Sequence, residues 1–240
     1  MQVTTLSFFR FQGPWNKFWA FQYMGLAKKP LRAQPGIGFL KMLGVGRYDG
    51  FHPAPNLGRY TILATWDSLE AAEAAVYRSD IFRRYRAHAS EHWTVFLVAF
   101  RSQGTWDEVE PFARADDARA SSPIAILTRA TINRQQLRPF WQSVPRVTEF
   151  ARSDVPGMRF KVGMGELPIV QLMTFSVWDD LESAKHFAYR GGEHRTTMRA
   201  ARRDGWFEEE LFVRFNVVGS TGSWDGTDPA EPAVNRRAAE

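Results

Sequence analysis

The sequence contains no cysteine in its 240 residues. This absence excludes disulfide bonds, thiolate zinc sites, iron–sulfur clusters, a cysteine nucleophile and a thiolate-ligated haem. Any metal would have to be held by histidine, carboxylate, tyrosine or methionine. The sequence also lacks an uninterrupted apolar run of about 18 residues and a signal-peptide pattern. We therefore expect no transmembrane helix and a bacterial cytoplasmic protein, with peripheral contact at the inner or intracytoplasmic membrane left open.

Several catalytic motifs are missing as well. The sequence holds no G-x-S-x-G nucleophile elbow, no Walker motif and no RNP pattern, and we expect no nucleic-acid partner. Two glycine pairs, Gly44–Gly46 and Gly163–Gly165, follow predicted strands and do not open helices. They therefore do not form a dinucleotide fingerprint, and we interpret them as turn glycines.

Aromatic residues and positive charge are abundant. Aromatics make up 14% of the chain, with nine tryptophans and nineteen phenylalanines, which favours either a bulky core or a large apolar ligand. The net charge is +5, which suits an anionic membrane surface, an acidic partner, an anionic cofactor or simply a solvated arginine-rich surface. The aromatic segment Trp15–Lys29 is either a core helix or a surface for lipid or apolar substrate.

The chain repeats itself once. Trp66 and Trp178 lie in matching segments, RYTILATWDSLE and QLMTFSVWDDLE, offset by 112 residues. Each copy alternates strand and helix patterns in the order βαββαβ, the ferredoxin-like unit. We predict an N-terminal repeat over 1–100, a polar linker over 101–123, a C-terminal repeat over 124–218 and a disordered tail over 219–240. Asp67 and Asp179 are the expected helix N-caps.

Strands in both copies are apolar on both faces, as at 62–64 and 172–175. A lone ferredoxin-like sheet buries only one face under its helices, so the second face must also be covered. We therefore predict an α+β protein whose two sheets pack as an intramolecular α+β barrel.

One histidine stands out as a candidate ligand. At the offset of 112, Phe82 of the first copy corresponds to His194 of the second. On a helix, His194 shares an inward face with Thr197 and Met198, beside a Gly-Gly step. This arrangement suits a histidine-ligated haem, and a core histidine bonded to the backbone is the alternative. His52, His88, His92 and His186 offer weaker contexts, and no convincing zinc set appears among them.

Short blocks in order along residues 3–218 resemble the spheroidene monooxygenases of purple bacteria, among them LSFFRF, PGIGFLKMLGVG, FRRYRAHASEHWTVFL, FKVGMGELP and GWFEEELFVRF. The resemblance implies a haem-dependent enzyme that inserts a C-2 keto group into spheroidene by two hydroxylations, with O₂ and reduced ferredoxin. Tandem ferredoxin-like haem proteins such as chlorite dismutases and aldoxime dehydratases resemble this architecture and bind haem in the C-terminal half.

The resemblance also implies roles for individual residues. His194 would be the catalytic residue and iron ligand, Arg195 or Lys161 would pair with haem propionates, and the remaining residues would line the site, namely Phe160, Met164, Phe175, Phe187 and Met198. Related acyclic carotenoids remain open as substrates, and so does the oligomeric state. A cofactor-free α+β-barrel monooxygenase and a non-catalytic binder of hydrophobic ligands remain the alternatives.

Overall fold

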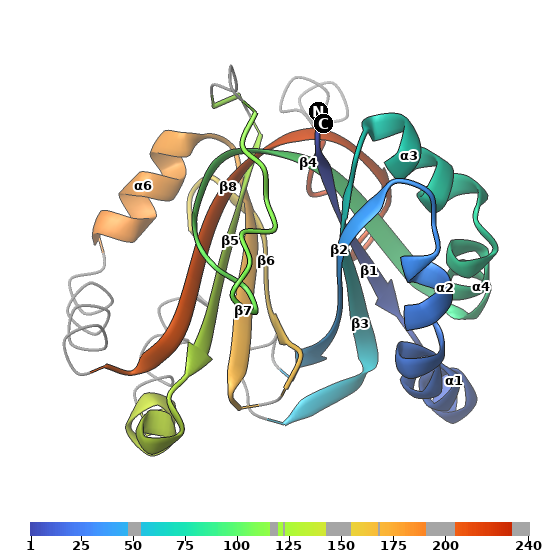
Figure 1. The fold of residues 1–240 in the computed structure, drawn as a ribbon, viewed down its shortest axis with the longest axis horizontal. Helices are drawn as coiled ribbons and strands as arrows, with labels where there is room; N and C mark the ends of the chain where they lie inside the picture. The colour runs from blue at the N-terminus through green and yellow to red at the C-terminus, as the bar shows by residue number, and fades with distance from the viewer. Residues whose placement is uncertain are drawn as a thin grey trace.

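The computed structural model describes residues 1–47, 54–115, 120–121, 123–142, 155–167, 169–190 and 205–231. In these residues, strands close into a barrel in the order β1-β3-β2-β6-β7-β5-β8-β4, with helices outside it (Figure 1). The strands are β1 (Val3–Arg10), β2 (Ile37–Gly46), β3 (Pro55–Trp66), β4 (Glu91–Gly104), β5 (Ile124–Ile132), β6 (Met158–Gly165), β7 (Gln171–Trp178) and β8 (Phe207–Gly222).

The helices lie on the outer faces of the two half-barrels, as Figure 1 shows. They are α1 (Gly13–Leu26), α2 (Lys28–Arg32), α3 (Leu69–Glu73), α4 (Asp80–His88) and α6 (Leu181–Arg190), with a π-helical turn η1 (Ala74–Arg78), a 3₁₀ turn η2 (Arg134–Gln136) and a short helix at 137–142. None of the described helices is long and apolar enough to cross a bilayer.

Both halves of the barrel have the same topology. The first half runs β4-β1-β3-β2 and the second runs β8-β5-β7-β6, and each pairs all its strands antiparallel. This is the βαββαβ ferredoxin-like order expected from the repeat. Val3 pairs with Trp66 in the first half, and Ile124 pairs with Trp178 in the second. These matching pairs show which strand positions of the two halves are equivalent. The predicted tandem α+β barrel is confirmed.

The two half-barrels meet at two seams of different length. At one seam β4 pairs with β8 along nearly its whole length. At the other, β2 and β6 share only the pairs Gly44↔Gly165 and Val45↔Met164. The glycines that we interpreted as turn residues end their strands as expected, but they also form this seam. A Cβ on Gly165 would lie 2.1 Å from the carbonyl oxygen of Gln171, so only glycine fits there.

Side chains alternate between the barrel interior and the outer faces. The interior holds an aromatic cluster in which Phe8 stacks on Trp93 at 5.2 Å between ring centroids, with Phe160, Phe175 and Trp224 around them. A second cluster fills the space between the first half's sheet and its helices. A smaller cluster lies between the second half's sheet and α6. The double burial of the strands follows from this arrangement.

The predicted helix caps are each wrong by one residue. Ser68, and not Asp67, caps α3, since its hydroxyl accepts from the Ala71 backbone N–H at 3.2 Å. In the second copy the Asp180 carboxylate accepts from the Ser183 N–H at 2.8 Å, while Asp179 pairs with Arg159. Asp67 instead ends the preceding segment, where its N–H bonds to the carbonyl oxygen of Gly36.

Two segments described as polar in sequence contribute to the core. β4 continues to Gly104, and Trp106 and Phe112 of the connector are buried in the barrel interior. The predicted disordered tail is wrong for residues 219–231, because β8 continues to Gly222 and Trp224 packs against Phe8. Residues 232–240 lie outside the described part of the chain. In both segments a few apolar side chains pack inside the barrel. The polar composition of each segment as a whole conceals these residues in the sequence.

Candidate functional site

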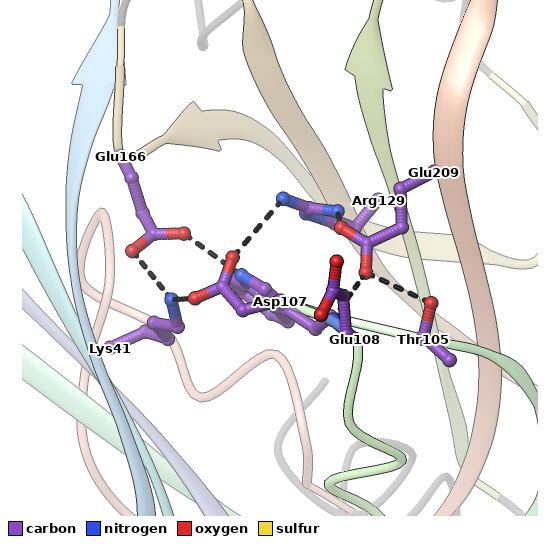
Figure 2. A network of polar contacts seen from close by, with 8 residues as sticks. Lys41, Thr105, Asp107, Glu108, Arg129, Glu166 and Glu209 are labelled. Carbon is purple, nitrogen blue, oxygen red and sulfur yellow. Dashed lines mark hydrogen bonds and ion pairs between the residues drawn. The ribbon is translucent and has the colours of Figure 1, made fainter.

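A charged network crosses one end of the barrel interior (Figure 2). Lys41 of β2, Arg129 of β5 and Glu209 of β8 occupy inward-facing strand positions, beside Phe39, Leu127 and Leu211 respectively. Asp107 in the β4–β5 connector and Glu166 after β6 reach the network from the rim of the barrel. The network therefore joins strands of both halves.

Lys41 anchors one side of this network. Its ammonium group pairs with Asp107 and lies 2.8 Å from Oε1 of Glu166. The other oxygen of Glu166 accepts from the indole N–H of Trp106 at 2.8 Å. The ammonium also lies 5.3 Å from the ring centroids of Phe39 and Trp106. Aromatic faces stabilise a cation that is partly removed from water, so the two rings and the two carboxylates together hold this side chain in place.

Arg129 anchors the other side and is only 2% exposed. Its guanidinium pairs with Glu209, lies 3.8 Å from Asp107 and stands over the Trp106 ring at 5.4 Å. Burial alone would raise the pKa of Glu209, but hydrogen bonds from the Glu108 N–H, the Thr105 hydroxyl and Arg129 outweigh it and lower the pKa. Glu209 is therefore ionised at neutral pH.

The carboxylates of this network are not arranged as a metal site. Its carboxylates already accept from lysine, arginine and indole groups, so no oxygen set converges on an open point. Among the described residues, no group of three or more His, Asp or Glu side chains is placed to hold a metal ion. Buried ion pairs of this kind fix how elements associate, which here means the rim of the barrel.

The outer sheet faces of the two halves differ in bulk. In the first half, Phe9, Met42 and Ile62 lie under the helices and are at most 7% exposed. The common register gives the equivalent positions of the second half. These equivalents are all smaller: Ala130 for Phe9, Gly163 for Met42 and Thr174 for Ile62. We call the part of the second sheet's outer face at Ala130, Gly163 and Thr174 the platform.

Polar groups border this platform. Lys161 of β6 occupies the position of Leu40, and Arg214 of β8 occupies that of Phe96. Lys161 and Arg214 are both half-buried, and the Arg214 guanidinium lies 5.2 Å from the Phe212 ring centroid. α6 lies over one edge of the platform, where Phe187 packs on Trp178 at 5.3 Å.

An apolar groove of about 300 Å³ runs next to the platform, along the β2–β6 seam. α1 borders one side of the groove and the helix at 137–142 borders the other. Its lining includes Phe21, Met24, Leu57, Trp141, Ile169 and Leu172. Gly165 and Leu172 in the groove lie two residues along their strands from Gly163 and Thr174, on the same face. The groove and the platform therefore adjoin.

The structure divides the predicted site residues into three groups. Phe160, Met164 and Phe175 face the barrel interior, whereas Lys161 and Phe187 lie on the outer side of the same sheet. His194, Arg195 and Met198 lie outside the described residues. Because the sheet separates the first group from the second, one ligand cannot contact both groups. The outer group alone adjoins the platform.

Among the other histidines, His88 stacks on Trp19 with ring centroids 4.0 Å apart and contacts the Asn16 side chain at 3.1 Å. His92 is partly buried in β4, and burial lowers its pKa. His186 is exposed on α6, as expected, and His52 lies outside the described residues. The structure does not bring His88 and His92 together with a third ligand.

Sequence reasoning missed the network at the barrel rim. Its one visible signal is Arg129, a lone charge within the apolar strand ILTRATI. It lies two residues after Leu127, on the same inward face of the strand. The small-residue platform was also missed, although the repeat alignment contains it, since Ile62 aligns with Thr174 at the offset of 112. Comparing bulk at aligned positions would have found it.

The fold and these surfaces define the class: a tandem ferredoxin-like α+β-barrel protein with an asymmetric second half. Spheroidene monooxygenase of Rhodobacter capsulatus is 37% identical over 99% of both chains, and that of Cereibacter sphaeroides is 38% identical over 100% of this chain and 74% of its own. The chain belongs to the spheroidene monooxygenase family. Residues 120–214 also match a domain of unknown function, DUF3291.

A solved aldoxime dehydratase has the same fold. It superposes with a TM-score of 0.63 at 10% identity, over 95% of this chain and 82% of its own. At this identity the likeness concerns the fold alone, and it agrees with the closed tandem barrel described above.

Proposed function

We propose that this protein is a haem-dependent carotenoid monooxygenase that inserts a keto group at C-2 of spheroidene or a related acyclic carotenoid. Membership of the spheroidene monooxygenase family supports the oxygenase activity and the carotenoid substrate. The observation that carries the haem proposal is the loss of bulk on the second half's outer sheet face, at Ala130, Gly163 and Thr174.

The repeat shows what occupies this space in the first half. There, Phe82 of α4 is buried and packs on Phe9 of β1 with ring centroids 6.3 Å apart. The repeat offset pairs Phe82 with His194, and the strand register pairs Phe9 with Ala130. An imidazole and a methyl group thus replace two phenyl rings. We propose that a haem ligated by His194 binds on this side of the second sheet.

The residues proposed to hold the haem follow from this placement. His194 is the residue proposed to hold the iron, since a chain without cysteine has no thiolate to offer. Lys161 and Arg195 are proposed to pair with the propionates, and Phe187 and Met198 to border the macrocycle. Phe160, Met164 and Phe175 would act from the barrel interior, where they support the sheet beneath the platform.

The reaction needs two oxygenations at one carbon. The haem, when bound, would supply O₂ activation. Each hydroxylation consumes one O₂, two electrons and two protons, leaves one oxygen atom on C-2 and releases the other as water. The second hydroxylation gives a geminal diol, which loses water to form the ketone. The role of the chain is to hold the polyene end against the platform and to exclude bulk water.

Reduced ferredoxin is the proposed electron donor, in the bacterial cytoplasm or at the membrane face. Residues 1–48 contain seven lysines and arginines and no acidic residue. Lys17, Lys28, Lys29 and Arg32 of this segment are exposed, and exposed cations attract acidic electron carriers and anionic lipid headgroups.

The absorption spectrum of the purified protein tests the proposal directly. Wild-type protein is expected to show a Soret band, and His194→Ala is expected to lose it while the far-ultraviolet circular dichroism stays unchanged. His186→Ala is the matched control, since this exposed histidine on α6 should leave the band intact. Colourless wild-type protein, or an unchanged band in His194→Ala, would contradict the assignment and favour a cofactor-free oxygenase or another ligand.

A further inference from the structure

The helix α1 exposes an apolar face that no described part of the chain covers. Trp15, Phe18 and Phe21 follow one another at intervals of three residues and are 73%, 53% and 63% exposed, and Leu26 is 67% exposed. The helical repeat of 3.6 residues places all four on one side. The opposite side of α1 carries Trp19, Ala20 and Tyr23, which pack into the core of the first half. A cluster of large exposed apolar side chains on one helix face marks an interaction surface.

The charges around this face indicate an anionic partner. Lys17 on α1 and Lys28 and Lys29 on α2 are exposed, and Arg32 follows them at the end of α2. No acidic residue occurs before Asp49, so nothing nearby in the sequence offsets these cations. Exposed tryptophan and phenylalanine flanked by lysine and arginine is the composition of helices that lie in the interface of a bilayer with anionic lipids.

The apolar groove adjoins the same helix. Phe21 belongs both to the exposed face and to the groove lining, together with Leu57 and Ile169, which are 54% and 41% exposed. Figure 1 shows α1, the β3 end of the β2–β3 connection and the short helix at 137–142 along the lower edge of the barrel. Beyond the seam the groove meets the platform at Gly163 and Thr174.

We propose that α1 docks the protein on an anionic membrane surface and holds the mouth of the seam groove against the lipid, from which an acyclic polyene enters. The docking part stands on the surface of α1 alone, and the identity of the molecule that enters rests on the proposed function. A C40 hydrocarbon has almost no solubility in water, so a groove that opens into lipid spares it an aqueous passage.

Sedimentation with vesicles tests the docking part without regard to haem or activity. Full-length protein is expected to bind vesicles made of a mixture of phosphatidylglycerol and phosphatidylcholine. Its affinity for vesicles of pure phosphatidylcholine should be lower by about tenfold or more. The partition of the double variant Trp15→Ser/Phe18→Ser into vesicles should fall about tenfold or more, because it lacks the two aromatic side chains that insert into the lipid. Neither residue lines the groove.

Tyr77→Ser is the matched control, since Tyr77 is an exposed aromatic outside α1 and is 49% exposed. It should bind vesicles like wild type. Lys28→Gln/Lys29→Gln should bind anionic vesicles more weakly and lose its dependence on salt. Wild-type protein that ignores anionic vesicles would overturn the docking proposal. So would a wild-type dimer that the Trp15/Phe18 variant converts to a monomer, since a second copy would then cover the face.

A comparison of two substrate preparations tests the groove. With polyene dissolved in vesicles, Trp15→Ser/Phe18→Ser should turn over about tenfold more slowly than wild type, and with polyene in detergent micelles it should match wild type. Equal loss in both preparations would overturn the role in delivery. Absence of all turnover in wild type, with vesicle binding intact, would contradict the proposed function and leave docking supported.

Discussion

Arg129 illustrates how single residues organise this barrel. Its guanidinium is 2% exposed, yet it is surrounded by an ionised carboxylate, a second carboxylate at 3.8 Å and an indole face. Removing one partner of such a group leaves a buried charge without compensation, which costs far more than losing a surface pair. Gly165 of the short seam is constrained in a different way, by the carbonyl group of Gln171 that approaches it. Both cases yield predictions at the scale of one side chain.

Glu209→Gln should destabilise the protein by about 3 kcal/mol at pH 7, because the buried Arg129 loses its carboxylate. The pKa of Glu209 is lowered in the folded state from the ordinary value of 4.5, so its contribution to stability is present at neutral pH and is lost as the pH falls below 4.5 through the lowered pKa. The free energy of unfolding, measured with urea between pH 7 and 3.5, should therefore fall less with decreasing pH in the variant than in the wild type. Glu182→Gln, with a side chain 80% exposed, should change stability by less than about 0.5 kcal/mol. Equal effects of the two substitutions would contradict this account.

Gly165→Ala should destabilise the protein by about 2 kcal/mol, because the new Cβ meets the Gln171 carbonyl oxygen at 2.1 Å and the short seam must shift. Its partner in the seam provides the control. A Cβ on Gly44 has its nearest neighbour at 4.0 Å, so Gly44→Ala should be neutral or slightly stabilising. Thermal unfolding of the two variants, followed by circular dichroism, measures the difference, and similar melting temperatures would refute the steric argument.

At the scale of elements, the helix starts follow the same local chemistry in both halves. Each helix after the third strand of a repeat begins at a residue whose side chain accepts from the N–H three positions on, Ser68 in one half and Asp180 in the other. The Ser68 hydroxyl also helps to hold the pKa of Glu70 below its usual value. The Trp-Asp-x-Leu-Glu pattern thus marks both helix starts, but its first aspartate is not the cap.

Ser68→Ala should cost about 1 kcal/mol of stability, as is typical for loss of an N-cap oxygen. Asp67→Ala removes the neighbouring carboxylate and should cost only about 0.3 kcal/mol, because that negative charge interacts favourably with the N-terminal end of the helix dipole. Chemical denaturation of both variants separates the two assignments. A larger loss in Asp67→Ala would show that the aspartate caps α3 after all.

At the scale of the whole molecule, the barrel is one closed core built from two unequal halves. The β4–β8 seam, the rim network and the residues after β8 all join the halves through the interior. The first half fills the space between its sheet and helices with aromatic side chains, and the second carries smaller residues at the positions of Phe9, Met42 and Ile62.

Trp224→Ala tests whether the segment after β8 is part of this core. Trp224 is 6% exposed and lies 5.9 Å from Phe8, centroid to centroid, so its loss should cost about 3 kcal/mol. Trp15→Ala removes the same side chain from an exposed position and should change stability by less than about 0.5 kcal/mol. Unfolding free energies of the two variants that agree within error would exclude a structural role for residues after Gly222.

The sequence by itself determined the repeat, the order of strands and helices, the double burial of the strands and hence the barrel. These follow from local periodicity and from one internal comparison, since residues 62–64 and 172–175 carry their apolar pattern without reference to the rest of the chain. The family resemblance added the carotenoid substrate, which periodicity could not supply.

Only the tertiary structure decided which face of each strand meets which neighbour. It separated Phe160, Met164 and Phe175 from Lys161 and Phe187, brought Arg129 to Glu209, and set Gly44 opposite Gly165. These contacts join residues up to 121 positions apart, and their geometry depends on strand pairing between the halves. Local sequence determines what a segment prefers to form, but contacts across a closed barrel are settled only when the seams close.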